Sequence, residues 1–434
     1  MTTYNENHYG RWLTKSELGT ASGPAYQQLS AFKTTKNQLL CRRCGETVSP
    51  EGQLPDGRFY CRHCLVMGRL VSEDCLYHLP RKAFVAQSYL VWQGELTPYQ
   101  REVSERLCQT VSKGQDCLVH AVTGAGKTEM IYQTIDQVLK TGGACAVVSP
   151  RIDVCIELHK RLKRDFSCKV GLLHGHSEPY TRCPLLVATV HQLYRFYQAF
   201  DVIIIDEVDA FPFVDDASLY YAVETALALD GVQVFLTATS TDALEAKVKA
   251  GQLLQLDLPR RFHGHPLVVP SFSWLNGLEK GVKKGLLPRA LVRDIKAQRA
   301  TGFPLLLFFP HIALGERLAQ SLKTALPHQK IGYVSSQEAQ RLTVVEAFRS
   351  GQLDILVTTT ILERGVTFPG VDVFVLWAHH RLYTKSSLVQ IAGRVGRSSD
   401  RPEGLLRFYH EGKTRAMVRA RQAIQEMNAK GGFS

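Results

Sequence analysis

Short apolar runs alternate with amphipathic stretches from about residue 95 onwards. The runs at 117–121, 201–205 and 304–310 are almost entirely apolar, and apolar residues recur at helical spacing between such runs. Strands of a parallel sheet are continuously apolar, because helices cover both faces of the sheet. The pattern therefore predicts an α/β chain whose parallel sheets are covered by helices.

The chain is long enough for more than one hydrophobic core, since it has 434 residues. A new strand–helix series begins at Pro304–Pro310, after a connector with the sequence Leu-Pro-Arg-Arg-Phe-His at 258–263. We therefore predict three parts, which are an N-terminal segment at 1–80, a first lobe at 81–257 and a second lobe at 258–434.

Four cysteines of the N-terminal segment form two CxxC pairs. These are Cys41 with Cys44 and Cys61 with Cys64. Each pair makes a tight turn that points two thiolates at one ion, and this separation is typical of a four-cysteine zinc ribbon. A redox CxxC is the alternative, but no thioredoxin-like βαβ pattern surrounds the pairs. The seven scattered cysteines are expected to pack as small apolar residues.

Basic and aromatic residues are interleaved around these cysteines. Two interpretations stay open: a surface that binds single-stranded nucleic acid, or a solvated basic face around a small metal-dependent core. The residues concerned are Arg42, Arg43, Arg58, Arg62, Arg69, Arg81 and Lys82, with Phe59, Tyr60 and Tyr77.

A phosphate-binding loop is predicted where the first apolar run ends. Small residues let backbone N–H groups close around phosphate oxygens at the start of the next helix. Lys127 would reach the β- and γ-phosphates, and the Thr128 hydroxyl would bind Mg²⁺. The first glycine of the usual pattern is replaced here by alanine. The loop residues are Ala121, Val122, Thr123, Gly124, Ala125, Gly126, Lys127 and Thr128.

Two acids follow the apolar run at 201–205. Asp206 and Glu207 would lie at the carboxyl edge of the sheet, where parallel sheets bind their ligands. Asp206 would hold Mg²⁺, and Glu207 would orient the attacking water. With the phosphate loop, this predicts a RecA-like lobe that hydrolyses a nucleoside triphosphate.

The segments around these two motifs resemble those of superfamily 2 helicases, in the same order. Gln100 resembles the glutamine that reads adenine, while 149–151, 187–189 and 237–239 resemble motifs Ia, Ic and III. The resemblance implies that ATP is the nucleotide. It also implies backbone contacts to nucleic acid from Arg151 and Thr189.

The second lobe carries two further helicase-like segments. Residues 354–367 resemble motif V, where Thr358 and Thr360 would contact nucleic acid and Gly365 and Thr367 would sense the nucleotide. Residues 390–397 resemble motif VI. Arg394 and Arg397 would stabilise the charge that phosphoryl transfer spreads over the γ-phosphate oxygens, with Arg397 the main candidate for the arginine finger.

The charge balance agrees with a nucleic-acid partner, since 52 Lys and Arg face 40 Asp and Glu for a net charge of +12. The first residues have no apolar signal region, and no apolar run is long enough to span a bilayer. We therefore expect a soluble, cytoplasmic protein.

The order of motifs behind a four-cysteine module resembles the late-competence ComFA family of Gram-positive bacteria. The stretches 121–131, 149–154, 206–213, 258–264 and 358–369 carry this resemblance, and the replication-restart helicase PriA is a more distant relative. The family implies an ATPase stimulated by single-stranded DNA that powers DNA uptake at the cytoplasmic face of the membrane. The partners it implies are the ComEC channel and a phosphoribosyltransferase-like ComFC protein, and a homo-oligomer is a further expectation.

Two other functions remain open from the sequence. One is a repair or replication-restart helicase, which would separate strands. The other is a zinc-dependent DNA-binding scaffold whose nucleotide pocket switches without turnover. For the metal, we expect that replacing Cys41 and Cys44 with serine releases one zinc and weakens DNA binding, while the motor lobes stay folded.

Overall fold

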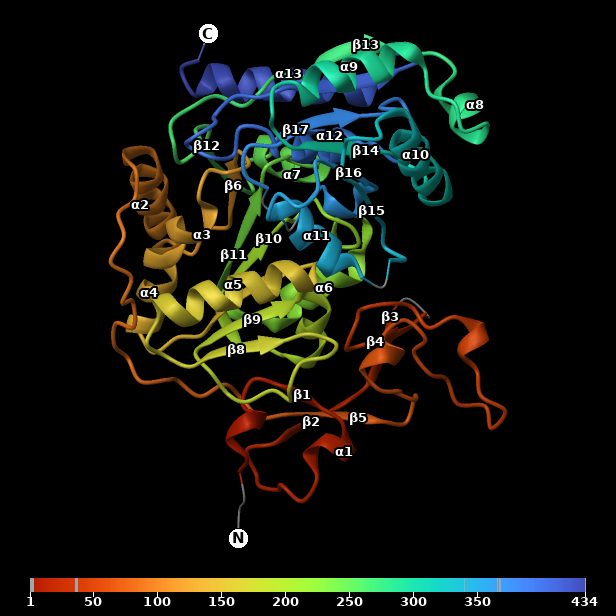
Figure 1. Ribbon diagram of the computed structural model, residues 1–434. Coiled ribbons are helices and arrows are strands. Elements are labelled where there is room, and N and C mark those ends of the chain that lie inside the picture. The colour runs from red at the N-terminus through yellow and green to blue at the C-terminus, as the bar shows by residue number, and fades with distance from the viewer. Residues whose placement is uncertain (1–3, 36–37, 339, 365, 367, 434) are drawn as a thin grey trace. The chain divides into compact units, whose positions relative to one another are not determined.

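The computed structural model describes residues 4–35, 38–338, 340–364, 366 and 368–433. The chain divides into two compact units, whose elements are labelled in Figure 1. The first unit contains Met1–His120 and Lys127–Asp257. The second contains Leu258–Ser434 together with the loop Ala121–Gly126.

The sheet of the first lobe has seven strands in the order β12-β6-β11-β10-β7-β9-β8. In the part of the sheet that runs from β6 through β11, β10, β7 and β9 to β8, every neighbouring pair is parallel. Ile204 of the central strand β10 lies opposite Val147 of β7 and Val234 of β11. The strands are β6 (Cys117–Ala121), β7 (Cys145–Ser149), β8 (Val170–Leu173), β9 (Leu185–Thr189), β10 (Phe200–Asp206), β11 (Leu227–Thr237) and β12 (Leu254–Leu258).

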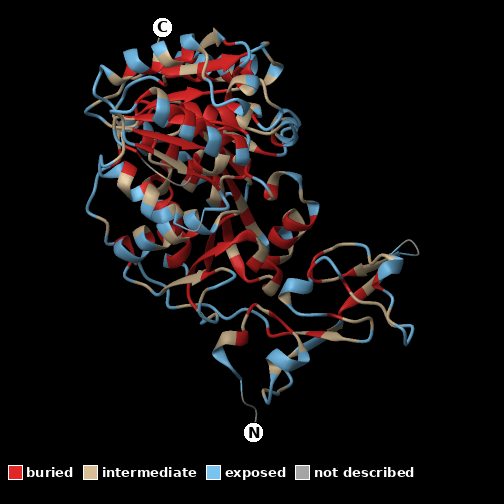
Figure 2. Cartoon of the chain, turned by 45° about the vertical axis from the view of Figure 1, so that its right-hand side comes forward, coloured by how far each residue is buried: buried red, intermediate tan, exposed pale blue. Residues whose placement is uncertain are grey.

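Helices connect these strands, as the alternating pattern predicts. They are α2 (Pro98–Ser112), α3 (Lys127–Met130), α4 (Tyr132–Lys140), α5 (Ile152–Asp165), η4 (Val190–Arg195), η5 (Phe213–Asp215), α6 (Ala217–Ala226) and α7 (Asp242–Lys249). The strands β7, β9, β14 (Leu305–Phe308), β16 (Ile355–Thr358) and β17 (Asp372–Val375) are buried throughout, and Figure 2 shows the buried interior of each lobe. Parallel strands joined by helices confirm the α/β fold class.

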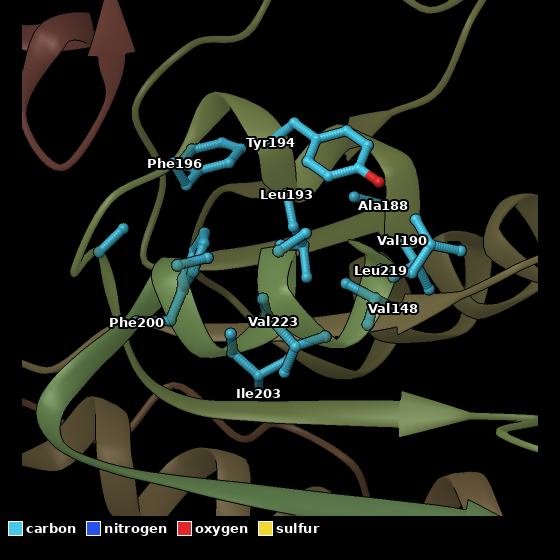
Figure 3. Close-up of a cluster of buried hydrophobic side chains, with 14 of the residues drawn as sticks. Val148, Ala188, Val190, Leu193, Tyr194, Phe196, Phe200, Ile203, Leu219 and Val223 are labelled. Carbon is cyan, nitrogen blue, oxygen red and sulfur yellow. The ribbon is translucent and has the colours of Figure 1, made fainter. Parts of the chain in front are cut away.

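One face of this sheet is covered by η4 and α6. Figure 3 shows Leu193 and Tyr194 beside Leu219 and Val223, packed against side chains of the sheet. Each fully buried aliphatic or aromatic side chain stabilises the fold by about 1.5–3 kcal/mol. The cluster therefore fixes α6 firmly to the strand β10 that carries the acidic motif.

The N-terminal segment packs on the same lobe. It has a three-stranded antiparallel sheet in the order β1-β5-β2 and a hairpin of β3 and β4. Trp12 stacks on Tyr197 of the first lobe with ring centroids 4.1 Å apart. Its elements are η1 (Glu6–His8), β1 (Trp12–Leu13), α1 (Lys15–Leu18), β2 (Gln27–Ser30), β3 (Phe32–Thr35), β4 (Gln38–Cys41), η2 (Pro50–Gly52), η3 (Leu65–Met67) and β5 (Cys75–His78).

The second unit contains a six-stranded sheet in the order β13-β18-β17-β14-β16-β15, with every neighbouring pair parallel. The strands are β13 (Ser271–Trp274), β14 (Leu305–Phe308), β15 (Ile331–Val334), β16 (Ile355–Thr358), β17 (Asp372–Val375) and β18 (Leu406–His410). The helices are α8 (Leu278–Lys283), α9 (Arg289–Arg299), α10 (Ile312–Ala325), α11 (Arg341–Arg349), η6 (Thr360–Leu362), α12 (Lys385–Ala392) and α13 (Arg415–Lys430). None of the described helices combines the length and apolar composition needed to cross a bilayer.

Candidate nucleotide, nucleic-acid and zinc sites

The phosphate loop lies between β6, which ends at Ala121, and α3, which begins at Lys127. Gly124 and Gly126 have φ angles of +80° and +75°. Side chains with a Cβ rarely adopt this left-handed conformation, so glycine allows the loop to turn its N–H groups inward. Thr128 follows in α3 and is half-buried.

The lysine of the loop and the first acid lie close together. The Nζ atom of Lys127 is 3.8 Å from Oδ1 of Asp206, which ends the central strand β10. The two motifs are 79 residues apart in the sequence, and the parallel sheet brings both to its carboxyl edge. A cation and a carboxylate at this spacing suit a triphosphate with Mg²⁺, because each binds one of its partners.

Glu207 has an unusual backbone conformation. Its φ angle is +57°, and its N–H donates to Oδ1 of Asp206 over 2.9 Å. The left-handed conformation costs a non-glycine residue about 1–2 kcal/mol. Such strain is typical of functional sites, where the position of a side chain matters more than its stability.

Asp209 is a site residue that the motif search did not assign a role. It is buried, and its carboxylate accepts hydrogen bonds from Thr237, over 2.7 Å, and from Thr239. The bonds join the turn after β10 to the segment that follows β11. The only signal in the sequence was the place of Asp209 next to the acidic pair.

Gln100 contributes to a helix cap. Its Oε1 accepts from the Thr97 N–H over 2.9 Å, which completes a capping box at the start of α2. The side chain is buried. Its reading of adenine stays a prediction.

The two residues of the first lobe that are predicted to contact nucleic acid lie at the starts of helical segments. Arg151 is the N-cap of α5 and Thr189 is the N-cap of η4. A groove of about 810 Å³ is lined by Thr189 and by Pro150 and Ile152, the two neighbours of Arg151. Its lining includes Pro150, Ile152, Thr189 and His191 of the lobe, and Arg11 and Met67 of the N-terminal segment.

Thr358 is one of the two residues of the motif V segment that are predicted to contact nucleic acid. Its side chain is fully buried at the end of β16, and its hydroxyl donates to the Thr359 carbonyl over 3.2 Å. The hydroxyl itself is therefore occupied inside the fold, and the predicted contact with nucleic acid at Thr358 stays a prediction. Thr360 begins η6 and is half-buried. Gly365 and Thr367 lie outside the described residues.

The two arginines of the second unit have different surroundings. Arg394 is buried, and its Nε donates to the Glu363 carbonyl over 3.2 Å. Arg397 is half-buried and lies beside the phosphate loop, since a Cβ built on Gly124 would be 3.8 Å from its Cγ. Both the loop and Arg397 belong to the second unit.

The four cysteines of the N-terminal segment form one buried cluster. Their sulfur atoms all lie within 4.8 Å of one another. Two of the pairs, Cys41 with Cys64 and Cys44 with Cys61, are separated by 3.8 and 3.5 Å. Four sulfurs around a tetrahedral zinc stand about 3.8 Å apart, because each bond is about 2.3 Å, whereas a disulfide needs about 2.05 Å. The cluster therefore fits zinc.

The buried side chain of Arg43 donates hydrogen bonds to one of the four cysteines. It is 3% exposed and donates to the Cys64 sulfur over 3.2 Å and to the Cys64 carbonyl over 2.8 Å. Donors to a ligand sulfur stabilise the thiolate that binds metal. Two other arginines of the interleaved set pair with acids, Arg58 with Asp56 at 2.6 Å and Arg62 with Glu51 at 2.8 Å. The contacts of Arg43 with Cys64 favour a role of Arg43 in the metal-dependent core, because its side chain is not at the surface.

Four of the seven scattered cysteines are buried, as expected of packed thiols, whereas Cys75, Cys108 and Cys168 are half-buried. Cys117, Cys145, Cys155 and Cys183 are buried. Burial raises the pKa of Cys117 and of Cys155 to about 12, so both stay protonated and unreactive at neutral pH.

Comparison with known proteins defines the class. Residues 93–241 match the family described as type III restriction enzyme, res subunit, and residues 286–399 match the helicase conserved C-terminal domain. The fold is that of the solved Saccharomyces cerevisiae Dbp5 bound to RNA and ADP BeF3, at a TM-score of 0.53 and 15% identity, covering 76% of this chain and 91% of that one. The chain is thus a helicase-type ATPase of superfamily 2, with two RecA-like lobes, and this fold implies ATP with Mg²⁺.

Two relatives then give the family. The chain is 53% identical to competence protein ComFA of Streptococcus pneumoniae over 99% of both chains. It is 38% identical to ComFA of Bacillus subtilis, over 92% of this chain and 88% of that protein. The chain belongs to the ComFA family, and the resemblance seen in the sequence is confirmed.

Proposed function

We propose that this chain is an ATP-driven motor that moves along single-stranded DNA and powers the uptake of transforming DNA during competence. The observation that carries the proposal is the approach of Lys127 to Asp206 at the edge of the sheet, with Glu207 next in the chain. Membership of the ComFA family supplies the setting. In this proposal residues 1–80 form the zinc segment, 81–257 the first lobe and 258–434 the second.

The proposed chemistry is attack of water on the γ-phosphorus of ATP. Lys127 and the loop N–H groups bind the phosphates, while Thr128 and Asp206 hold Mg²⁺. Glu207 orients the water and accepts its proton as the bond to ADP breaks. Arg394 and Arg397 stabilise the negative charge on the transferred phosphoryl group. Gln100 reads adenine, and Gly365 and Thr367 sense the nucleotide.

The groove of the first unit is the proposed path of the DNA strand. Pro150 and Ile152 flank Arg151, and Thr189 lines the groove itself. Backbone N–H groups and cations at helix starts are common phosphate ligands. Arg11 and Met67 also line this groove, which makes the N-terminal segment part of the proposed path. In the second lobe the corresponding contacts are assigned to Thr360 and to the backbone at Thr358.

The place and partners of the motor follow from the family. We assign it to the cytoplasmic face of the membrane, with the ComEC channel and a ComFC-like phosphoribosyltransferase-like protein as partners. An oligomer of identical chains belongs to the same proposal. Co-purification of tagged chain with each partner from competent cells tests these assignments.

The decisive experiment measures ATP hydrolysis with and without single-stranded DNA, using RNA as the comparison. We expect DNA to raise the rate and both Lys127→Ala and Glu207→Gln to abolish it. Glu207→Gln should still bind ATP, because the loop and its lysine remain. The exposed Lys113→Ala is the matched control and should keep the wild-type rate. Hydrolysis that ignores every nucleic acid would refute the motor.

A tailed duplex separates the motor from the restart helicase. Translocation without strand separation is expected, measured by displacement of a bound protein from the tail together with retention of the duplex. Efficient unwinding would favour a repair or replication-restart role. Bound ATP that is never hydrolysed in a single turnover would favour the nucleotide-switched scaffold.

A further inference from the structure

A buried guanidinium lies beside the phosphate loop and takes no part in the chemistry described above. Arg261 is in the connector that follows β12, and it is 2% exposed. A Cβ built on Gly124 would lie 3.9 Å from its Cγ and 4.0 Å from its Cδ. The connector and the loop are also joined by their backbones, since the N–H of Phe262 donates to the Gly124 carbonyl over 3.1 Å.

Only one of the three nitrogens of Arg261 has a hydrogen-bond partner among the described residues. Its Nη1 donates to the carbonyls of Val395, over 2.8 Å, and Gly396. Its Nε and Nη2 are buried and unpaired. A buried donor without a partner costs about 1–3 kcal/mol, and more when it carries a charge. Such a group is retained where a ligand supplies the acceptor.

The charge of Arg261 is also uncompensated. In the part of the chain that the structure describes, no carboxylate lies within ion-pair distance of it. Burial is the main cause that lowers the pKa of Arg261, and the positive charge of Arg397 lowers it further, to about 10. The charged group that acts on Arg261 is therefore another cation. With this pKa, Arg261 remains charged at neutral pH. A buried guanidinium with a second, half-buried guanidinium near it favours the binding of an anion, which offsets the repulsion between the two cations.

We propose that Arg261 binds the phosphate chain of ATP through its Nε and Nη2. The carbonyls of Val395 and Gly396 hold the side chain from one side, so the other edge of the guanidinium faces the ligand in a fixed orientation. A planar fork of two N–H donors fits two phosphate oxygens, which a lysine ammonium does not match. Within the second unit, Arg261 thus adds a third cation to the proposed pair Arg394 and Arg397. This inference rests on the proposed nucleotide site.

The test compares the affinities of ATP, ADP and AMP, measured without DNA by displacement of a fluorescent ATP analogue in the presence of Mg²⁺. Arg261→Ala should weaken ATP and ADP binding by about 10- to 100-fold, because a charge-assisted hydrogen bond to the phosphates is lost. AMP binding should weaken by less than about threefold. Arg261→Lys should recover part of the loss because the charge returns. A merely structural role would weaken all three nucleotides alike.

The neighbouring Arg260 supplies the control. Its Nε donates to the Gly431 carbonyl over 2.6 Å and its guanidinium lies over the Phe433 ring, so Arg260→Ala removes an arginine from the same connector without touching the loop. It should bind ATP as the wild type does. The inference is overturned if Arg261→Ala binds ATP with wild-type affinity, or if AMP affinity falls as far as ATP affinity. The variant Lys127→Ala distinguishes this inference from the proposed function. If Lys127→Ala binds ATP as tightly as the wild type, the proposed nucleotide site is wrong. If only Arg261→Ala binds ATP normally, the site stands and the role of Arg261 is wrong.

Discussion

The Oγ atom of Ser218 lies 2.7 Å from Nε2 of His63, and this contact joins the second cysteine knuckle to the first turn of α6. Ser218 also donates to Asp216 over 2.6 Å. Nearby, the Tyr221 hydroxyl donates to the Arg42 carbonyl over 3.1 Å. The four cysteines share one buried cluster with side chains of the first lobe. The zinc segment and that lobe are therefore one folded unit.

Loss of zinc should destabilise the first unit, contrary to the expectation from sequence that the lobes stay folded. In Cys41→Ser/Cys44→Ser we expect elemental analysis to find one zinc fewer per chain. The free energy of unfolding should fall by at least about 3 kcal/mol, because metal binding is part of the folding energy. Urea denaturation followed by circular dichroism measures the change. Cys75→Ser, outside the cluster, is the control, and an unchanged unfolding curve after zinc loss would contradict a shared core.

Replacing Glu207 with glycine should make the protein more stable and inactive. Its φ of +57° is strained for any residue with a Cβ, and glycine relieves this strain. We expect the free energy of unfolding to rise by about 1 kcal/mol, measured by urea denaturation, while ATP hydrolysis is lost. Glu207→Gln removes the same charge but keeps the Cβ. If both variants unfold at the same urea concentration, backbone strain is not the cause.

Asp209 should be needed for both stability and turnover. Asp209→Ala leaves the buried hydroxyls of Thr237 and Thr239 without their acceptor, which costs about 1–3 kcal/mol. ATP turnover should also fall, because the turn after β10 loses its connection to the end of β11. Unfolding and steady-state hydrolysis are measured on the same preparations. The exposed Asp215→Ala should change neither, and equal effects of the two substitutions would argue against a specific connection.

The two threonines of the motif V segment should differ in DNA binding. Thr358→Val fills the same buried space and loses one hydrogen bond, so the affinity for single-stranded DNA should stay unchanged. Thr360→Ala should weaken binding about two- to tenfold, the range of one neutral hydrogen bond. Fluorescence anisotropy with a labelled oligonucleotide measures both. Weaker binding in Thr358→Val at unchanged stability would show that the Thr358 hydroxyl itself contacts the DNA.

Local chemistry is what the sequence determined by itself. The strand, loop and helix around Lys127 are contiguous in the chain, and the apolar run that buries β10 ends directly at Asp206. The same holds for the CxxC pairs, because two residues between cysteines fix the geometry of each knuckle. The α/β fold class follows from the lengths and periodicity of the apolar runs. None of these features needs knowledge of which strands are neighbours.

The tertiary structure decided which distant residues meet. Thr237 reaches Asp209 because β11 pairs with β10, and the burial of Thr358 depends on β16 lying between β14 and β15. Arg43 looks like a surface cation in the sequence, yet it donates to a sulfur 21 residues away. Arg260 and Arg261 are adjacent and cannot be told apart in the sequence. Only the structure shows that Arg261 packs against the phosphate loop, while Arg260 donates to the Gly431 carbonyl. Strand order and burial depend on the whole chain, because two strands pair stably only when the other strands and helices complete the hydrophobic core around them.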